Sequence, residues 1–421
     1  MIKNWPRYRL VFMMGMIIIM LFVNVFSGRI VVNVRAEESG ISLSVADTGR
    51  YVEKVEQLAS DLYNNNNFAT QTGGGAAPNS GKYAAYAPTG YFSWDSESTS
   101  VGGSPKNRSW TYYNGIMMDA FLMLDSASYI QKVNDFYDIN INSSGNVDNK
   151  NPDDSNKNKN KYATEELDSI PPTRALFDLI KSGNRGDGNK YVYMIDYVYN
   201  VMENYKTAYL SNSEYGVLGF FENCGGNFRH KIVKRNSGNS WLTWPIALDG
   251  LYMANPFYME IANALDAGIL TQNDFIQYTG INNAPTSGTL YNEVCNRLLW
   301  IGNNLYDSSS GLYHHGYNPA TGKGNGHFWS RAIGWYAAAL ADVISMLPAG
   351  YESQRTALIN YEKQLFDGML AYQDVDTGMW YNVVNKTSDD YSANLLESSG
   401  TALMAYSSEF WTIFYVLFLA R

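Results

Sequence analysis

Apolar residues recur every three or four positions over much of this sequence, which is the spacing of one face of an α-helix. Clear runs lie at 52–62, 191–205 and 358–369, and another predicted helix opens at Trp329 and runs to about Leu347. The alternation of apolar and polar residues that is typical of strands is scarce. The chain is therefore predicted to be all-α.

A weak internal repeat lies between the predicted helices. Asp307-x-x-x-Gly311-Leu-Tyr-His recurs 67 residues later as Asp374-x-x-x-Gly378-Met-Trp-Tyr, and looser relatives lie at 90–94 and 226–231. Helix pairs that are joined by glycine-then-aromatic loops predict α-hairpins whose loops gather on one face. The expected fold is an α/α toroid with aromatic residues at its mouth.

The first 36 residues have the order of a secretory signal peptide. Three basic residues precede an uncharged, mostly apolar run of 17 residues (10–26), and Val34-Arg35-Ala36 fits a small-x-small cleavage site. The alternative is an uncleaved membrane anchor, because 17 residues is the lower end of spanning length. We expect cleavage and secretion, or retention at the cell surface if the segment stays uncleaved.

Charge and cysteine content exclude several classes of protein. The sequence has 31 basic and 40 acidic residues; without the five basic residues of the first 36 positions the balance is 26 against 40, or −14. A surface of that sign repels phosphate backbones, so nucleic acid is not an expected partner. Two cysteines, Cys224 and Cys295, exclude a disulfide-rich scaffold and a four-cysteine zinc site. They leave one bridge or two free thiols, and we expect free thiols.

Residues 142–161 interrupt the helical pattern. Asn, Lys, Asp and Ser dominate these twenty residues, and Val147 is the one strongly apolar residue among them. So polar a segment buries too little surface to order itself. We predict a surface insertion loop within a single domain that spans 37–421. A linker between two domains is the alternative, but the composition is the same on both sides.

Two carboxylates stand out by their surroundings. Asp249 lies in an apolar predicted helix (247–253), where burial should raise its pKa and suit it to donate a proton. The alternative is a buried structural Asp that is hydrogen-bonded. Asp168 precedes Pro171-Pro172, which fits a helix start, so capping of that helix alone would explain it.

Arg331 lies near two tryptophans, Trp329 and Trp335, at the start of a predicted helix. Arg331 and Trp335 are four residues apart, which places them on one face. A guanidinium pairs bidentately with a carboxylate and an indole stacks on a sugar ring, so this set predicts a site for a carboxylated sugar. The alternative is a core-facing Trp beside a surface Arg.

All four histidines, His230, His314, His315 and His327, lie close to glycine-rich turns. For any one of them alone, a hydrogen bond to loop backbone explains the position as well as a functional role does. No two stand at helix-face spacing with an acidic partner, so a metal site is not expected.

Seven short motifs follow one another between residues 108 and 408. They are Tyr113-Asn114-Gly115, Leu167–Leu176, Asn227–Lys231, Leu248–Met253, His315-Gly316-Tyr317, Trp329–Tyr336 and Glu397-Ser398-Ser399. In this set and order the chain resembles the unsaturated rhamnogalacturonyl hydrolases of glycoside hydrolase family 105, with the unsaturated glucuronyl hydrolases of family 88 as cousins.

The resemblance implies an (α/α)6 barrel without metal or other cofactor. It further implies removal of a 4,5-unsaturated uronic acid from the non-reducing end of oligosaccharides that polysaccharide lyases leave from pectin, rhamnogalacturonan or similar polymers. By the same resemblance Asp249 is the general acid and base and Asp168 is a supporting carboxylate. The implied substrate-binding residues are His230, Lys231, His315, Trp329, Arg331 and Trp335. For the substrate carboxylate, Arg331 is the first choice and Lys231 the second.

Two departures from the family pattern bear on these expectations. Ala247 stands where an aromatic residue is usual, with Trp244 nearby as a substitute, and the chain ends soon after an apolar run at 410–420. We therefore expect a toroid that is incomplete at its C-terminus. The competing functions are a sugar epimerase on a similar toroid and a carbohydrate-binding protein without catalysis. The aglycone and the oligomeric state stay open.

The order of the N-terminal regions predicts that the mature chain begins near Glu37. Amino-terminal sequencing of secreted protein should return a start at or near this residue. Membrane-bound protein that retains Met1 would contradict cleavage.

Overall fold

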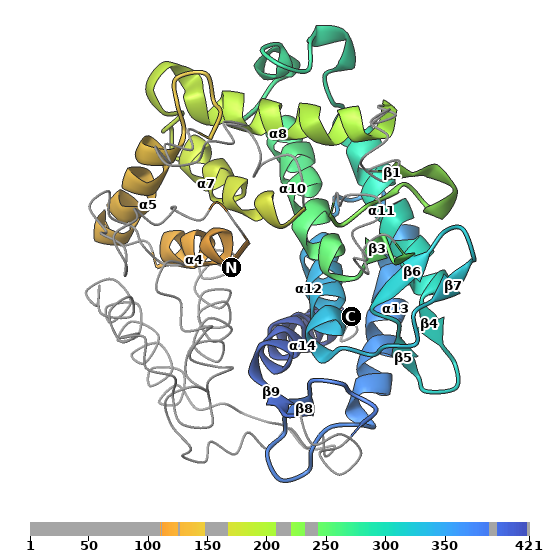
Figure 1. Cartoon of the computed structure of the whole chain (residues 1–421). Helices are drawn as coiled ribbons and strands as arrows, with labels where there is room; N and C mark the ends of the chain where they lie inside the picture. Colours follow the sequence, from red (N-terminus) through yellow and green to blue (C-terminus); the bar gives the residue numbers. More distant parts are fainter. Residues whose placement is uncertain are drawn as a thin grey trace, which may run out of the picture. The chain divides into compact units, whose positions relative to one another are not determined.

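The computed structural model describes residues 110, 112–124, 127–147, 167–207, 220–231, 243–386 and 394–418. They belong to two compact units, and Figure 1 labels helices and strands of both. The described part of the first comprises 110–147 and 171–197, and that of the second comprises 167–170 and 198–418. The predicted signal peptide, the predicted helix at 52–62 and residues 148–161 of the predicted loop lie outside the described residues.

The first unit is built from helices. They are α4 (Tyr112–Met123), α5 (Ala127–Asn140), α7 (Ala175–Lys181) and α8 (Lys190–Thr207) as far as Tyr197, with the short turns η3 (Pro171–Thr173) and η4 (Asp187–Asn189). Gly115 lets α4 approach η3 closely, since an added Cβ would lie 2.4 Å from the carbonyl carbon of Pro171. The first six residues of the predicted insertion loop form a tight turn here, and Val147 is buried and bridged to Ile141.

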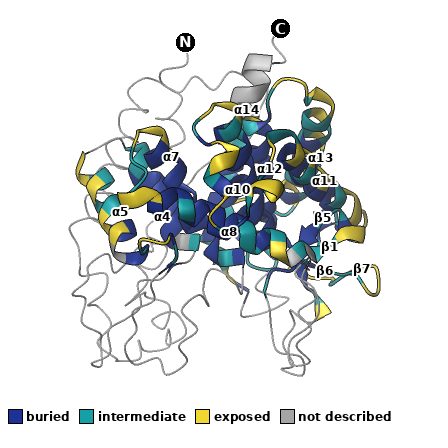
Figure 2. Cartoon of the chain, turned by 90° about the horizontal axis from the view of Figure 1, so that it is seen from above, coloured by how far each residue is buried: buried dark blue, intermediate teal, exposed yellow. Residues whose placement is uncertain are grey.

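The second unit contains the larger helical core. Its helices are the rest of α8, α10 (Asp249–Asp266), α11 (Ser287–Asn304), α12 (Ser330–Met346), α13 (Glu352–Leu370) and α14 (Ser398–Phe418), with the turns η2 (Leu167–Ser169), η5 (Glu222–Cys224), η6 (Gln272–Phe275) and η7 (Ile281–Asn283). Helix α12 packs on α10 and α14, and α11 packs on α10 and α13. Figure 2 shows α10 and α12 as largely buried. Three predicted helices are thereby confirmed as α8, α12 and α13.

Strands are short and lie in the loops between these helices. They are β1 (Phe220–Phe221), β2 (Asn227–Phe228), β3 (Ile246–Ala247), β4 (Tyr306–Asp307), β5 (Leu312–Tyr313), β6 (Gly316–Asn318), β7 (Lys323–Gly324), β8 (Trp380–Tyr381) and β9 (Leu396–Glu397). All pairs are antiparallel: β1 with β2, β3 with β6, β6 with β7, β4 with β5, and β8 with β9. Among the described residues no helix combines the length and apolar character needed to cross a bilayer.

The two copies of the sequence repeat form equivalent turns. The amide of Gly311 donates to the carbonyl of Asp307 at 2.8 Å, and the amide of Gly378 donates to the carbonyl of Asp374 at 2.8 Å. Both glycines have positive φ, +74° and +70°, which an L side chain rarely adopts. Each aspartate side chain also accepts hydrogen bonds from hydroxyl residues of its own turn. The repeat therefore reflects a shared turn that leads into β5 and β8.

The two cysteines are separate, buried thiols in the second unit. Burial raises the pKa of both Cys224 and Cys295 to about 11. Both are therefore protonated at neutral pH, where a thiol is a poor nucleophile.

Glu362 of α13 is an acid in an apolar setting. It is 3% exposed, its Oε1 has no hydrogen-bond partner among the described residues, and burial raises its pKa well above the usual range. The unfolded chain releases this proton near pH 4.5, whereas the folded chain holds it to higher pH. Stability from this group is therefore full below pH 4.5 and is lost as pH rises through the raised value.

We expect Glu362→Gln to raise the Tm relative to the unmodified protein, by a margin that grows between pH 5 and pH 8. The amide keeps the shape of the side chain but has no proton to lose. Thermal unfolding across this pH range measures the effect, with the exposed Asp367→Asn on the same helix as control. A Tm difference that does not change with pH would contradict ionisation as the cause.

Candidate active site

Backbone hydrogen bonds connect the loops that carry most of the candidate residues of the second unit. They run from amide to carbonyl between Leu167 and His230 (3.0 Å), His230 and Pro245 (2.8 Å), Leu248 and His315 (3.0 Å), His315 and His327 (2.8 Å), Ser330 and Asn382 (3.0 Å), and Asn382 and Leu395 (2.8 Å). We call these six bonds the loop ladder. Segments distant in sequence are thereby fixed side by side, as the predicted gathering of loops requires.

Asp249 and His315 are brought together by the pairing of β3 with β6. Ala247 lies opposite Gly316, so Asp249, which follows β3, and His315, which precedes β6, become neighbours. The Nε2 atom of His315 lies 2.9 Å from Oδ2 of Asp249. Their side chains are 15% and 21% exposed, so the pair is partly accessible from solvent.

The prediction that Asp249 has a raised pKa is wrong for the free protein. Burial does raise the pKa of Asp249, but the hydrogen bond and charge of His315, followed by the charges of His230 and Arg331, lower it well below the usual range. Positive charges near a carboxylate favour its ionised form. Asp249 is therefore a carboxylate at neutral pH in the absence of a ligand.

Asp168 forms a second carboxylate cluster with His230 and Lys231. Its Oδ2 lies 3.0 Å from Nζ of Lys231, and its Oδ1 lies 3.5 Å from Nε2 of His230. The residue belongs to η2, whereas α7 begins after Arg174 without a side-chain cap. Capping of that helix, the simpler explanation from the sequence, therefore does not account for Asp168.

Arg331 lies beside Trp329 at the start of α12. Its guanidinium carbon is 4.8 Å from the Trp329 ring centre, a cation–π arrangement, and its Nη1 is 3.5 Å from Oε1 of Glu397. The Trp329 ring stands edge-on to the His315 ring, with centroids 5.3 Å apart. Trp329 Nε1 has no hydrogen-bond partner among the described residues. The cation, the indole and the Asp249–His315 pair thus form one continuous cluster.

Trp335 lies apart from this cluster. It is 1% exposed and packs on Tyr252 of α10, with ring centroids 4.9 Å apart. Its ring therefore contributes to the contact between α10 and α12, and its burial does not support the predicted contact with substrate. The alternative reading, a core-facing Trp beside a more exposed Arg, fits this position.

Glu397 has no role predicted from the sequence. It belongs to one of the seven motifs, but nothing in that motif places it near Arg331, which is 66 positions away in the chain. Glu397 and Arg331 meet because β9 and α14 lie beside α12, and only the folded structure reveals this neighbourhood.

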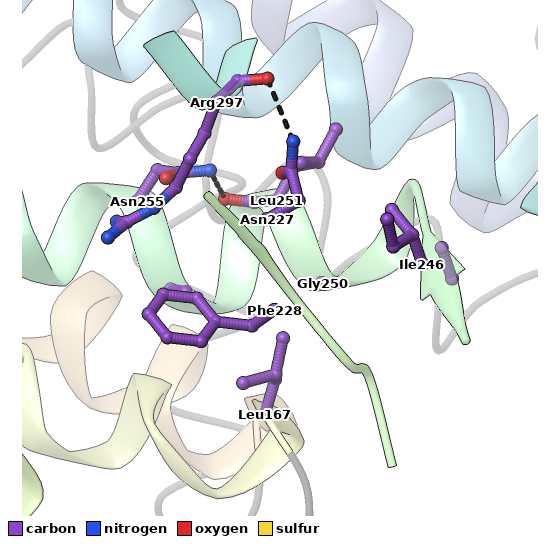
Figure 3. A pocket seen from close by; sticks show the side chains of 10 residues that line it. Leu167, Asn227, Phe228, Ile246, Gly250, Leu251, Asn255 and Arg297 are labelled. Atoms are coloured by element: carbon purple, nitrogen blue, oxygen red, sulfur yellow. Dashed lines mark hydrogen bonds between the residues drawn. The ribbon is translucent and has the colours of Figure 1, made fainter. Parts of the chain in front are cut away.

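A small cavity lies behind the first turns of α10, with room for a single water molecule (Figure 3). Its lining includes Gly250, Asn255 and Arg297. Arg297 is 1% exposed, lies 4.5 Å from the rings of both Phe228 and Tyr258, and donates to Glu293 at 2.7 Å. This space is too small for a sugar ring.

Gly250 makes α10 sensitive to added volume next to Asp249. An added Cβ would lie 2.8 Å from Cδ1 of Leu167 and 3.3 Å from Nδ1 of His230. Gly288 occupies the same second position of α11, where an added Cβ would meet only Tyr351 Oη at 3.9 Å. The two glycines therefore form a matched pair.

We expect Gly250→Ala to reduce stability by about 1–3 kcal/mol through overpacking, seen as a Tm lower by several degrees. Gly288→Ala should leave the Tm unchanged or slightly raised, since it only removes unfolded-state freedom. Differential scanning calorimetry of both variants tests the contrast. Equal Tm values would show that the side chains of Leu167 and His230 can move away from the added methyl group without loss of stability.

The fold of this chain is similar to that of a glycoside hydrolase of known structure. A solved structure of a family 105 glycoside hydrolase from C. acetobutylicum ATCC 824 is similar, with a TM-score of 0.54, 23% identity and coverage of 74% of each chain. This likeness, together with the helical content, confirms the predicted (α/α)6 fold class.

Two curated relatives match a shorter stretch. They are Protein Atu3128 of Agrobacterium fabrum and the 24.9 kDa protein in picA locus of Rhizobium radiobacter, each 34% identical over 112 residues. The match covers 24% of this chain and 46% of theirs, so the chain spans less than half the length of these relatives. The model of Glycosyl Hydrolase Family 88 matches residues 88–408. Because that match covers most of the sequence and includes every cluster described above, the chain belongs to Glycosyl Hydrolase Family 88.

Proposed function

We propose that this protein is a glycoside hydrolase that removes a 4,5-unsaturated uronic acid from the non-reducing end of lyase-generated oligosaccharides. The observation that carries the proposal is the pair of Asp249 and His315, 2.9 Å apart, in one cluster with Arg331 and Trp329. The cluster combines a proton-transferring pair, a cation for a carboxylate and a partly exposed indole that can contact a sugar. Pectin and rhamnogalacturonan fragments are the substrates that the family resemblance favours.

The chemistry requires one group that gives and then takes a proton. Asp249 delivers a proton to C4 of the enol ether, and the positive charge that develops at C5 is shared with the ring oxygen. The Asp249 carboxylate then removes a proton from the water that attacks C5. The hydrated ring is a hemiketal, which opens and releases the neighbouring sugar, so hydration of the double bond leads to cleavage.

The protonation state of Asp249 has to change when substrate binds. In the free protein the pKa of Asp249 is low because of His315, His230 and Arg331, so the carboxylate holds no proton. A bound uronate brings a negative charge to Arg331 and displaces water, and both changes raise the pKa of Asp249. His315, 2.9 Å away, is placed to pass the proton to it.

Asp168 fits a supporting role. Lys231 at 3.0 Å and His230 at 3.5 Å compensate its charge, and the same His230 contributes to the field at Asp249. Asp168 therefore holds Lys231 and His230 in place beside the reacting carboxylate. Lys231, 28% exposed, stays the second choice for the substrate carboxylate.

A carbohydrate-binding protein without catalysis is the second candidate. The observation that favours it is the low pKa of Asp249, because a permanent carboxylate cannot protonate C4. Such a protein would still use Arg331 and Trp329 to hold a uronate.

Asp249→Asn preserves shape but can neither donate the proton to C4 nor accept one from water. We expect turnover of an unsaturated uronyl disaccharide to fall by at least ~10²–10⁴-fold. The measurement is the decay of ultraviolet absorbance as the conjugated double bond is hydrated, with circular dichroism to verify folding. Asp367→Asn on the exposed face of α13 is the control and should turn over normally.

Three outcomes separate the candidates. Turnover that depends on the double bond and on Asp249 supports the hydrolase. Substantial activity in Asp249→Asn would move the acid to another group, with Asp168 next. An unmodified protein that binds the disaccharide without turning it over would favour the binding protein.

A further inference from the structure

Glu397 is held firmly by the helix that follows it. Its carboxylate accepts hydrogen bonds from the Ser399 hydroxyl and the Gly400 amide, and its carbonyl accepts one from Thr401 Oγ1 at 2.7 Å. Its backbone is paired with Trp380 in the β8–β9 ladder. The Glu397 side chain is only 16% exposed, so contacts with neighbouring residues hold its orientation.

The same turn of α14 lies directly on the backbone that carries Arg331. An added Cβ at Gly400 would be 2.7 Å from the carbonyl carbon of Ser330 and 2.8 Å from the amide nitrogen of Arg331. Close backbone contact between α14 and α12 therefore fixes the distance between the Cα atoms of Glu397 and Arg331. The backbones that carry the two side chains therefore cannot easily move apart.

The contact of Glu397 with Arg331 engages only part of the guanidinium. Nη1 lies 3.5 Å from Oε1, longer than the 2.7–2.9 Å of a strong charge-assisted hydrogen bond. A guanidinium carries five N–H donors, and among the described residues only Nη1 of Arg331 has a hydrogen-bond partner, so Nε and Nη2 can receive a second, bidentate carboxylate. The Arg331 side chain is 35% exposed, so solvent reaches part of it.

We propose that Glu397 is a positioning residue that holds Arg331 over Trp329 with one edge occupied, so that the other edge receives the carboxylate of the substrate. The inference rests on the proposed function. Capping of α14 alone would explain the bonds to Ser399 and Gly400, but it does not require Arg331 opposite them. A capping role and a positioning role predict different kinetics.

The test compares Glu397→Gln with Ser399→Ala. Glutamine keeps an acceptor for the α14 turn but loses the charge that attracts Arg331, whereas the alanine variant removes one cap bond and keeps that charge. For Glu397→Gln we expect a rise in KM of about 10-fold with kcat changed by less than about two-fold. Ser399→Ala should lower the Tm while its KM stays near that of the unmodified protein.

A double-mutant cycle then identifies the route of the effect. In the Arg331→Lys background, Glu397→Gln should add little to KM, because the guanidinium that it positions is gone. Effects that multiply independently would overturn the proposal. So would an unchanged KM, which indicates a cap alone, or a lowered KM, which indicates that Glu397 competes with the substrate.

Failure of the proposed function is recognised separately. If the unmodified protein does not turn over the unsaturated disaccharide, the same variants are compared by its Kd from calorimetry. Positioning of Arg331 then predicts a roughly 10-fold weaker Kd for Glu397→Gln and no change for Ser399→Ala. Equal affinities of the unmodified protein and Glu397→Gln would reject the role of Glu397 in either case.

Discussion

The site depends on one short antiparallel pairing, that of β3 with β6. Two aligned residue pairs place Asp249 at the start of α10 and His315 next to it, and the Trp329 ring in turn contacts the His315 ring. A partly buried carboxylate needs such a partner, because desolvation of an unpaired charge is costly. The loop ladder connects further loops in the same way, from Leu167 to Leu395, by hydrogen bonds between backbone atoms.

Much of the helical core is predictable because it follows from local periodicity. Helices α8, α12 and α13 match runs of apolar spacing, and the turns at Asp307 and Asp374 match a repeat that is visible in the letters. The strand pairs are not predictable in this way. Each strand has only two or three residues, too few to show alternation, and the pair that builds the site, β3 with β6, joins Ala247 to Gly316, far away in the chain.

The site was predictable as a set of residues and not as an electrostatic unit. The apolar neighbours of Asp249 indicate burial, and burial alone raises a pKa; the histidines that reverse the sign come from other loops. Trp329 and Trp335 show the same limit, because two indoles six residues apart look alike in the sequence. Only the packing of α12 on α10 distinguishes the half-buried ring from the core ring.

The starts of α10, α12 and α14 lie within this one cluster, at Asp249, at Ser330 and at Ser398. The amino end of a helix carries a partial positive charge from its unsatisfied amides, worth roughly 0.3–1 kcal/mol to a nearby anion. Two of these ends lie beside carboxylates: Asp249 is the first residue of α10, and at α14 the Gly400 amide donates to the Glu397 carboxylate, in a chain whose net charge is −9. In an acidic chain, helix ends of this kind are therefore a source of positive potential that no basic side chain has to supply.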